Sequence, residues 1–250
     1  IEITERQLVT NAIRGMALDF KGNGLILVGP PGTRKTELFF ELLADPRFRL
    51  QANDLVFVRL QGKNLMAECV ERKLYMPTPT VELYPALASL FDLSKCENVV
   101  TRKEDCQDAE CQRAEECRLD RGAPFCYRAS ANGYTMLDPN WLYGRGGYPR
   151  KNNLRWIFIL RSDAVSPGFV ELNREEALRV FESGETPGAV RTLASGKHQP
   201  FFNPHLLGTS PEKLELQRAF FQRALEGVKV YLFNSGVAGA DKIKDLISSP

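Results

Sequence analysis

Residues 24–36 decide how this chain is interpreted, and they read Gly24-Leu25-Ile26-Leu27-Val28-Gly29-Pro30-Pro31-Gly32-Thr33-Arg34-Lys35-Thr36. An apolar run of strand type enters a Gly-Pro-Pro-Gly turn, and a helical pattern follows as far as residue 43. Phosphate-binding loops read G-x-x-x-x-G-K-[ST] between a strand and a helix. Gly29, Lys35 and Thr36 fit this pattern, but Arg34 stands where the second glycine belongs. The stretch therefore predicts a phosphate-binding loop with one departure.

The chemistry of the loop supports this prediction. A triphosphate needs several N–H donors and compact positive charge, and a glycine turn that enters a helix N-terminus supplies the donors. We expect Lys35 to reach the outer phosphates and the Thr36 hydroxyl to bind Mg²⁺. ATP and Mg²⁺ are the cofactors this implies. The nucleotide-binding set is Gly29, Pro30, Pro31, Gly32, Thr33, Arg34, Lys35 and Thr36. The alternative is an ordinary strand, turn and helix with a solvated Lys35.

Arg34 is open to three interpretations. Its guanidinium could stabilise charge in a transition state, it could occupy the γ-phosphate position, or it could point away from the loop. Glycine is normally needed at this position because it has no side chain. The second and third interpretations are therefore favoured together, and the presence of Arg34 weakens the case for catalysis more than the case for binding.

Composition limits the class of protein. Apolar residues make up 43% and charged residues 26% of the 250 residues, which is ordinary for a globular protein. The formal net charge of +2 gives no reason to expect a nucleic-acid partner. No apolar run has the length of a membrane span. We expect a cytoplasmic protein without membrane or nucleic-acid partners, with its oligomeric state open between monomer and homo-oligomer.

Strands and helices alternate along the chain, which predicts an α/β fold with a mixed sheet and flanking helices. The expected strands are 24–28, 48–60 with a polar break at Asn53-Asp54, 156–160 and 228–233. The expected helices are 2–18, 37–43, 81–90, 173–183 and 211–227.

Polar residues follow the buried strand 156–160. Arg161 and Asp163 lie directly after it, and α/β sheets keep ligands at the carboxyl ends of their strands. Arg161 is expected to meet phosphate and Asp163 to meet Mg²⁺. The alternative, weighted equally, is a structural pair that orients the loop.

Several segments, in this order, resemble the phosphoenolpyruvate carboxykinase and HPr kinase superfamily. They are the loop GPPGTRKT at 29–36, RFRLQANDLVFV at 47–58, CENVV at 96–100, GRGGYP at 144–149, the stretch 157–186 and VYLFNSG at 230–236. The resemblance covers about residues 20–100 and 140–240. It implies one carboxykinase-like nucleotide-binding domain over 1–250, similar to the C-terminal catalytic domain of the carboxykinases.

The resemblance also implies roles for single residues. Asp54 matches the second acid of a family pair, with Asn53 in place of the first, and would hold Mg²⁺ or act as base on an acceptor hydroxyl. Arg145 falls at the family's catalytic arginine, and Glu97 at its nucleotide-contacting glutamate. The alternatives are an exposed turn aspartate, a solvated arginine in a glycine turn and a charged residue on a strand edge.

The departures from the family pattern separate three functions. The carboxykinases place a lysine and a histidine, both metal ligands, just before the loop, where this chain has Met16-Ala17-Leu18-Asp19-Phe20. The first hypothesis is an ATP-dependent phosphotransferase, in which Lys35, Asp54 and Arg145 are catalytic and a small molecule or protein is the acceptor. The second is a catalytically impaired nucleotide sensor or scaffold. The third is a carboxykinase-type lyase.

A cysteine-rich segment interrupts the family pattern at about 101–130. Five of the six cysteines lie between Cys96 and Cys126, in a segment with few large apolar residues. Metal binding or disulfides would supply the order that burial does not. Cys106, Cys111, Cys117 and Cys126 are the expected ligands of zinc or an iron–sulfur cluster. Disulfides and free thiols are the alternatives.

Overall fold

The structure, a computed structural model, describes residues 10–30, 32–71, 73–78, 93–106, 117–126, 133–138, 148–183 and 211–248, and the single residues 80, 84, 140 and 144. The chain divides into two compact units, one of residues 1–71 and 147–250 and one of residues 72–146. The smaller unit includes the cysteine-rich segment and sequence on both sides of it. A single domain with an insertion at about 101–130 stays a prediction.

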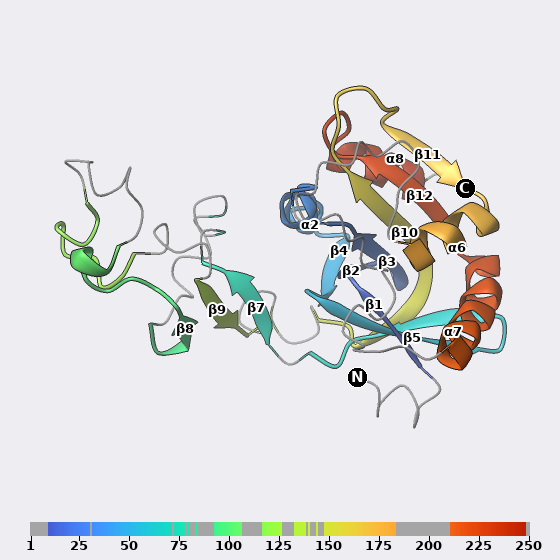
Figure 1. Cartoon of the computed structure of the whole chain (residues 1–250), viewed down its shortest axis with the longest axis horizontal. Helices are drawn as coiled ribbons and strands as arrows, with labels where there is room; N and C mark the ends of the chain where they lie inside the picture. The colour runs from blue at the N-terminus through green and yellow to red at the C-terminus, as the bar shows by residue number, and fades with distance from the viewer. Residues whose placement is uncertain are drawn as a thin grey trace. The chain divides into compact units, whose positions relative to one another are not determined.

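The larger unit is built on a mixed nine-stranded sheet (Figure 1). Its strands are β1 (Asn11–Arg14), β2 (Met16–Phe20), β3 (Asn23–Val28), β4 (Phe48–Ala52), β5 (Leu55–Gln61), β6 (Asn64–Glu68), β10 (Lys151–Arg161), β11 (Phe169–Leu172) and β12 (Lys229–Asn234). They follow the order β1-β5-β6-β10-β3-β2-β4, and β12 pairs with both β10 and β11. β10 runs parallel to β3 and to β12, while the other pairs are antiparallel.

Helices flank this sheet, so the predicted mixed α/β architecture is confirmed. They are α2 (Lys35–Leu43), α6 (Arg174–Ser183), α7 (Pro211–Ala224) and α8 (Ala240–Ser248). α2 contacts α8, and α6 packs on α7 (Figure 1). The rings of Phe181 and Phe221 meet between α6 and α7 with centroids 5.5 Å apart. Both rings are fully buried, so this contact closes the core on that side.

The sheet bends back on itself at two corners that touch. Gly15 alone separates β1 from β2, and Asn53-Asp54 alone separate β4 from β5. β1 and β4 are the first and last strands of the strand order. The chain runs from β1 into β2, which pairs with β4, and from β4 into β5, which pairs with β1. The two corners therefore connect the two ends of the order. The Gly15 amide donates to the Asp54 carbonyl at 2.9 Å and ties the corners together. The backbone at residues 53–55 is called the 53–55 turn below.

Most of the predicted elements are confirmed. β3, the β4–β5 pair with its polar break, β10 and β12 lie where the apolar runs indicate, and α2, α6 and α7 lie where the helical patterns do. α6 begins with a capping box. The Asn173 amide donates to the Glu176 carboxylate at 2.9 Å, and the Glu176 amide donates to the Asn173 side chain at 3.0 Å.

The predicted helix over 2–18 is wrong for its described part. Residues 11–14 and 16–20 form β1 and β2, while residues 1–9 lie outside the described ranges. Every residue of β2 is buried, because the strand lies between β3 and β4 and is covered on both faces. Continuous burial removes the alternation that marks a half-exposed strand. The predicted helix over 81–90 lies outside the described residues apart from Tyr84.

The smaller unit contains a three-stranded sheet of order β7-β9-β8. The strands are β7 (Leu74–Pro77), β8 (Cys96–Glu97) and β9 (Tyr134–Leu137), with single 3₁₀ turns at Leu93–Lys95 and Lys103–Asp105. Leu74, Met76 and Leu137 are buried beneath it. This unit therefore has an apolar layer of its own.

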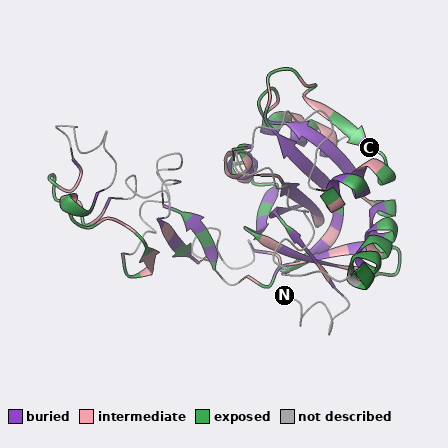
Figure 2. Cartoon of the chain, viewed as in Figure 1, coloured by how far each residue is buried: buried purple, intermediate pink, exposed green. Residues whose placement is uncertain are grey.

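Burial concentrates in the sheet of the larger unit (Figure 2). Among the carboxylates that the structure describes, that of Asp19 is buried with it at 1% exposure. Asp19 accepts from the Arg49 guanidinium at 2.7 and 3.0 Å, from the Gly22 amide at 3.1 Å and from the Asn152 side chain at 3.3 Å. Buried charges are tolerated when they are paired in this way.

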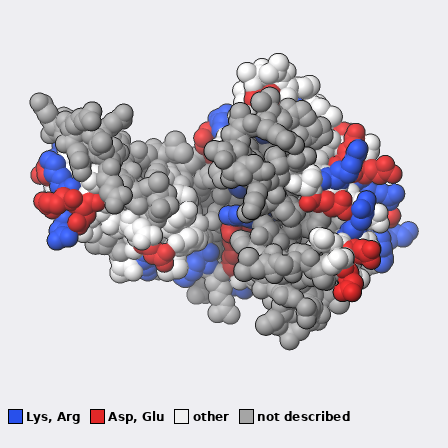
Figure 3. All heavy atoms as spheres, viewed as in Figure 1, with Lys and Arg blue, Asp and Glu red and all other residues white. Residues whose placement is uncertain are grey.

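The outer surface is mixed in charge. Over α6 and α7, acidic and basic side chains are interspersed (Figure 3). Among the helices that the structure describes, none combines the length and the apolar character needed to cross a membrane.

Replacing Gly15 by Ala should lower the free energy of unfolding by about 1–3 kcal/mol, the usual effect of overpacking a core. A Cβ atom there would lie 2.6 Å from the Leu27 carbonyl oxygen and 2.9 Å from Ile26 Cγ2. Gly227→Ala is the matched control, since its nearest neighbour, the Lys63 carbonyl oxygen, is 3.7 Å away. Denaturant unfolding compares the two variants, and equal midpoints would contradict the close packing at Gly15.

Candidate functional site

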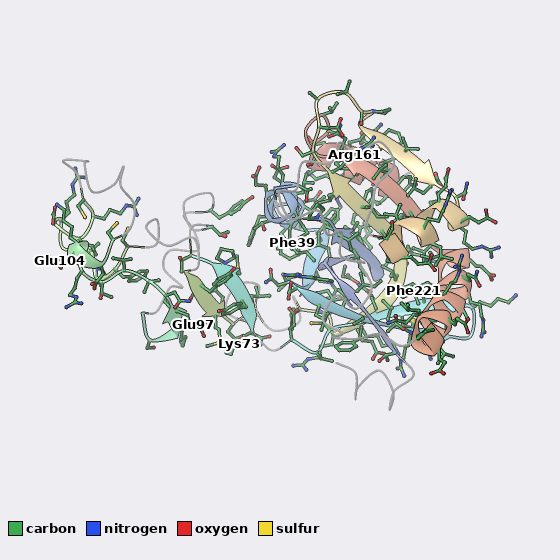
Figure 4. All side chains as sticks on the ribbon, viewed as in Figure 1. Phe39, Lys73, Glu97, Glu104, Arg161 and Phe221 are labelled. Atoms are coloured by element: carbon green, nitrogen blue, oxygen red, sulfur yellow. The ribbon has the colours of Figure 1, made fainter. Side chains whose placement is uncertain are left out.

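Three parallel strands end at one edge of the large sheet. β10 lies between β3 and β12, with Val28 paired to Ile159 and Arg161 paired to Asn234. Arg161 is the last residue of β10 (Figure 4). The segments that follow these strands begin at residues 29, 162 and 235. Such an edge is where open α/β sheets place their ligands.

The loop from β3 to α2 needs glycine twice, for different reasons. A Cβ on Gly29 would lie 2.9 Å from the Thr33 hydroxyl and 3.0 Å from the Leu160 carbonyl oxygen, so a side chain there would collide with the loop and with β10. Gly32 has open space around it but a φ of +83°, which favours glycine. The Thr33 hydroxyl donates to the Pro30 carbonyl at 2.8 Å and closes the loop. Pro31 lies outside the described residues.

Arg34 adopts the left-handed conformation at the start of α2, with φ 53° and ψ 24°. This conformation explains why the motif calls for glycine here, since it costs other residues roughly 1–2 kcal/mol. The guanidinium donates to the Glu37 carboxylate at 2.7 Å and to the Ser235 carbonyl at 3.0 Å, and it lies 3.6 Å from the Glu41 carboxylate. A role in a transition state would require it to leave both carboxylates.

Lys35 folds back over the loop. Its ammonium group donates to the Gly29 carbonyl at 3.1 Å. Burial lowers the pKa of Lys35, the positive charge of Arg14 lowers it further, and the negative charge of Asp54 opposes them. An anion bound on the loop would stabilise this partly desolvated ammonium group. Thr36, half-buried in the first turn of α2, comes directly after it.

The negative charge of Asp54 acts to raise the pKa of Lys35. The Asp54 carboxylate is 55% exposed and accepts from the Arg14 guanidinium at 3.3 Å. An ion pair this exposed contributes at most about 1 kcal/mol to stability. Asn53, which stands at the position of the missing acid, is buried.

Glu71 was not predicted as a site residue, yet it holds the turn that carries Asp54. Its carboxylate accepts from the backbone amides of Asn53, Asp54 and Leu55 at 2.9, 3.0 and 2.7 Å. Burial raises the pKa of Glu71, while these three donors act in the opposite direction. No motif marks this residue, because its partners are backbone groups.

Arg161 and Asp163 follow β10 and face each other, with Arg161 Nε 3.6 Å from the Asp163 carboxylate. One oxygen of Asp163 accepts from the amides of Val165 and Ser166 at 3.0 and 2.6 Å. The Ser166 amide is the main reason why the pKa of Asp163 is lowered. Asp163 therefore uses one oxygen to shape its own loop and turns the other toward Arg161.

Ser235, also not predicted, links the three strand ends. Its hydroxyl lies 2.9 Å from the Thr33 carbonyl and 3.0 Å from the Arg161 carbonyl, and it can donate to one of them at a time. Its amide donates to the Arg161 carbonyl at 2.8 Å. The buried Asn234 side chain donates to the carbonyls of Asp163 and Ser166 at 2.9 and 3.0 Å. The loop, β10 and β12 are thereby joined.

Two predicted site residues fall outside the described part of the larger unit. Arg145 lies outside the described residues. Glu97 belongs to the smaller unit, where its carboxylate accepts from the Tyr75 hydroxyl (Figure 4). The Tyr75 ring stacks on Tyr134 at 4.6 Å. Their roles at the nucleotide remain those that the resemblance implies.

The described cysteines do not assemble a metal centre. Cys106, Cys117 and Cys126 are buried, while Cys111 lies outside the described residues. Within the described part of the chain, no three His, Cys, Asp or Glu side chains gather to hold a metal ion. No disulfide joins any two of the five cysteines that the structure describes. The expected zinc or iron–sulfur site is thus unsupported.

Comparison with known proteins gives a weak structural likeness. No protein-family model matches the chain, and no curated protein matches it. Among 56 matching chains of solved structures is the HPr(Ser) kinase/phosphatase from Coxiella burnetii. It is 10% identical with a TM-score of 0.32, covering 64% of this chain and 70% of that chain. No residue role is taken from a likeness this distant.

Replacing Arg34 by Gly should leave the protein more stable than replacing it by Ala, by about 1–2 kcal/mol. Both variants lose the contacts to Glu37, Glu41 and Ser235, so their difference isolates the left-handed backbone. Denaturant unfolding of the pair measures it. Equal stability would contradict the conformation described for Arg34.

Proposed function

We propose that this chain is a Mg²⁺-dependent, ATP-using phosphotransferase whose acceptor is a small molecule or a protein. The observation that carries the proposal is the position of Lys35. Its ammonium group lies partly desolvated across a glycine-constrained loop, at the N-terminus of a helix and at the edge where three parallel strands end. Each of these features favours a bound phosphate.

Triphosphate binding would use the loop between Gly29 and Thr36. The first amides of α2 have no partner within the helix and carry the positive end of its dipole. Lys35 would exchange the Gly29 carbonyl for a phosphate oxygen. The Thr36 hydroxyl and the Asp54 carboxylate are hard oxygen donors of the kind Mg²⁺ prefers, so these residues fit the ion. Bound there, Mg²⁺ would neutralise charge on the outer phosphates.

The transfer step would form one bond to phosphorus and break another. The acceptor oxygen bonds to the γ-phosphorus while the bond from that phosphorus to the β,γ-bridging oxygen breaks, and ADP leaves. In the alternative role left open for Asp54, in which it is not a ligand of Mg²⁺, its carboxylate would take the acceptor proton, since it is exposed and reachable from solvent. Arg161 and Asp163 would line the same edge.

A nucleotide-binding sensor without transfer activity is the second candidate. The contacts of Arg34 favour it, because Glu37, Glu41 and the Ser235 carbonyl hold its guanidinium beside the loop. Asn53, in place of an acid, points the same way. Such a protein would bind ATP with Mg²⁺ and release it unchanged.

ATP with Mg²⁺ should stabilise the protein against heat, and Lys35→Ala should abolish most of this effect. A ligand at 100 times its dissociation constant adds about 2.7 kcal/mol to the free energy of unfolding. For a chain of this size, this raises the melting temperature by roughly 5–11 °C. Lys63→Ala, in the exposed β5–β6 turn, is the control and should respond like the wild type. A wild type that no nucleotide stabilises would overturn the proposal.

Asp54→Asn should separate the transferase from the sensor. If Asp54 takes the acceptor proton, loss of the carboxylate should reduce γ-phosphate transfer by about 10²–10⁴-fold, while Mg²⁺-free ATP binding stays intact. Asp241→Asn is the control, because it removes a carboxylate whose side chain is 93% exposed on α8. Phosphate transfer is followed over a panel of acceptors with γ-labelled ATP. Absence of transfer by the wild type to every acceptor would favour the sensor.

A further inference from the structure

The 53–55 turn is built around one carboxylate. Three consecutive backbone amides converge on Glu71: Asn53 on Oε2 at 2.9 Å, and Asp54 and Leu55 on Oε1 at 3.0 and 2.7 Å. Consecutive amides that point inward form a concave anion-binding site in proteins. Here an acidic side chain of the same chain fills it.

The backbone of Glu71 is itself anchored. The Tyr148 hydroxyl donates to the Glu71 carbonyl at 2.7 Å and lies 3.0 Å from Cys69 Sγ. The Cys69 amide donates to the Arg150 carbonyl at 2.8 Å. Cys69 and Tyr148 are both buried. The backbone that carries the Glu71 side chain is therefore anchored by contacts separate from those of the 53–55 turn.

Asp54 is the residue whose freedom this arrangement limits. Its amide is held by Glu71 and its carbonyl by the Gly15 amide at 2.9 Å, so its backbone is fixed on both sides. Its carboxylate, 55% exposed, retains only side-chain torsions. A ligand to a metal or a base for a proton gains from such preorganisation.

We propose that Glu71 is the positioning residue that aims the Asp54 carboxylate at the Mg²⁺ of the bound nucleotide. The inference rests on the proposed function, and it assigns Glu71 no contact with the metal or with the nucleotide. The fold has other means of holding the turn: β4 pairs with β2, β5 pairs with β1 and β6, and Gly15 bridges the corners. The precise aim of Asp54, rather than the fold, depends on Glu71.

The test measures ATP affinity by calorimetry in EDTA and across a Mg²⁺ titration. In Glu71→Gln the side-chain oxygen can still accept hydrogen bonds from backbone amides of the turn. The side-chain NH₂ group, which replaces the other oxygen, is a donor and cannot accept from a backbone N–H. The turn therefore loses at least one hydrogen bond. Mg²⁺ is expected to increase the affinity for ATP, and the Mg²⁺ midpoint is the concentration that gives half of this increase. In Glu71→Gln the Mg²⁺ midpoint should rise about 10- to 100-fold. The affinity in EDTA should stay as in the wild type.

Two further variants control the test. Glu68→Gln removes a carboxylate three residues earlier, which pairs at the surface with Arg59 at 2.7 Å and Lys151 at 3.5 Å, and it should titrate with Mg²⁺ like the wild type. Tyr148→Phe keeps the Glu71 carboxylate but frees its backbone, and it should shift the Mg²⁺ midpoint in the same direction by less.

Each outcome decides the inference. A Mg²⁺ midpoint in Glu71→Gln equal to that of the wild type overturns it while the proposed function stands. If Glu71→Gln does not fold and Tyr148→Phe titrates like the wild type, Glu71 is structural only and the inference is also overturned. A wild type that binds no ATP with or without Mg²⁺ overturns the proposed function, and the inference with it.

Discussion

The parallel pairing of β10 with β3 on one side and β12 on the other is the constraint on which the rest of the site depends. It brings three chain segments from distant parts of the sequence to one edge. Close packing then locks them, since Gly29 leaves no room for a Cβ against Leu160, and the Ser235 hydroxyl reaches both the loop and the end of β10. The N-terminus of α2 and the Lys35 ammonium group are held at that edge as a consequence.

The local sequence predicts the strand, loop and helix at this edge. It does not predict the corners at Gly15 and at the 53–55 turn. The loop, its strand and its helix are contiguous and follow local rules of burial, turn chemistry and capping. Glu71 accepts from backbone amides 16 to 18 residues away along the chain. The Ser235 hydroxyl contacts a backbone carbonyl 202 residues away. No spacing rule in the sequence reveals contacts of this kind. The apolar residues of β1 and β2 fit helical spacing and so predict a helix, whereas the pairing that makes them strands is non-local.

Arg34 shows how a departure from a motif can be accommodated. The backbone keeps the left-handed conformation that glycine would adopt there, and the side chain contacts two carboxylates and a carbonyl beside the loop. The loop therefore keeps its shape with an arginine in it. Phosphate binding would depend on that shape, whereas the proposed transfer would also depend on what the guanidinium does when a nucleotide arrives.

Amide hydrogen exchange with and without ATP and Mg²⁺ tests most directly whether this edge is a nucleotide site. If it is, exchange should slow at residues 32–36, whose amides would face phosphate, and at the 53–55 turn only when Mg²⁺ is present. Unchanged exchange at 32–36 in protein saturated with nucleotide, with protection in some other segment, would contradict it.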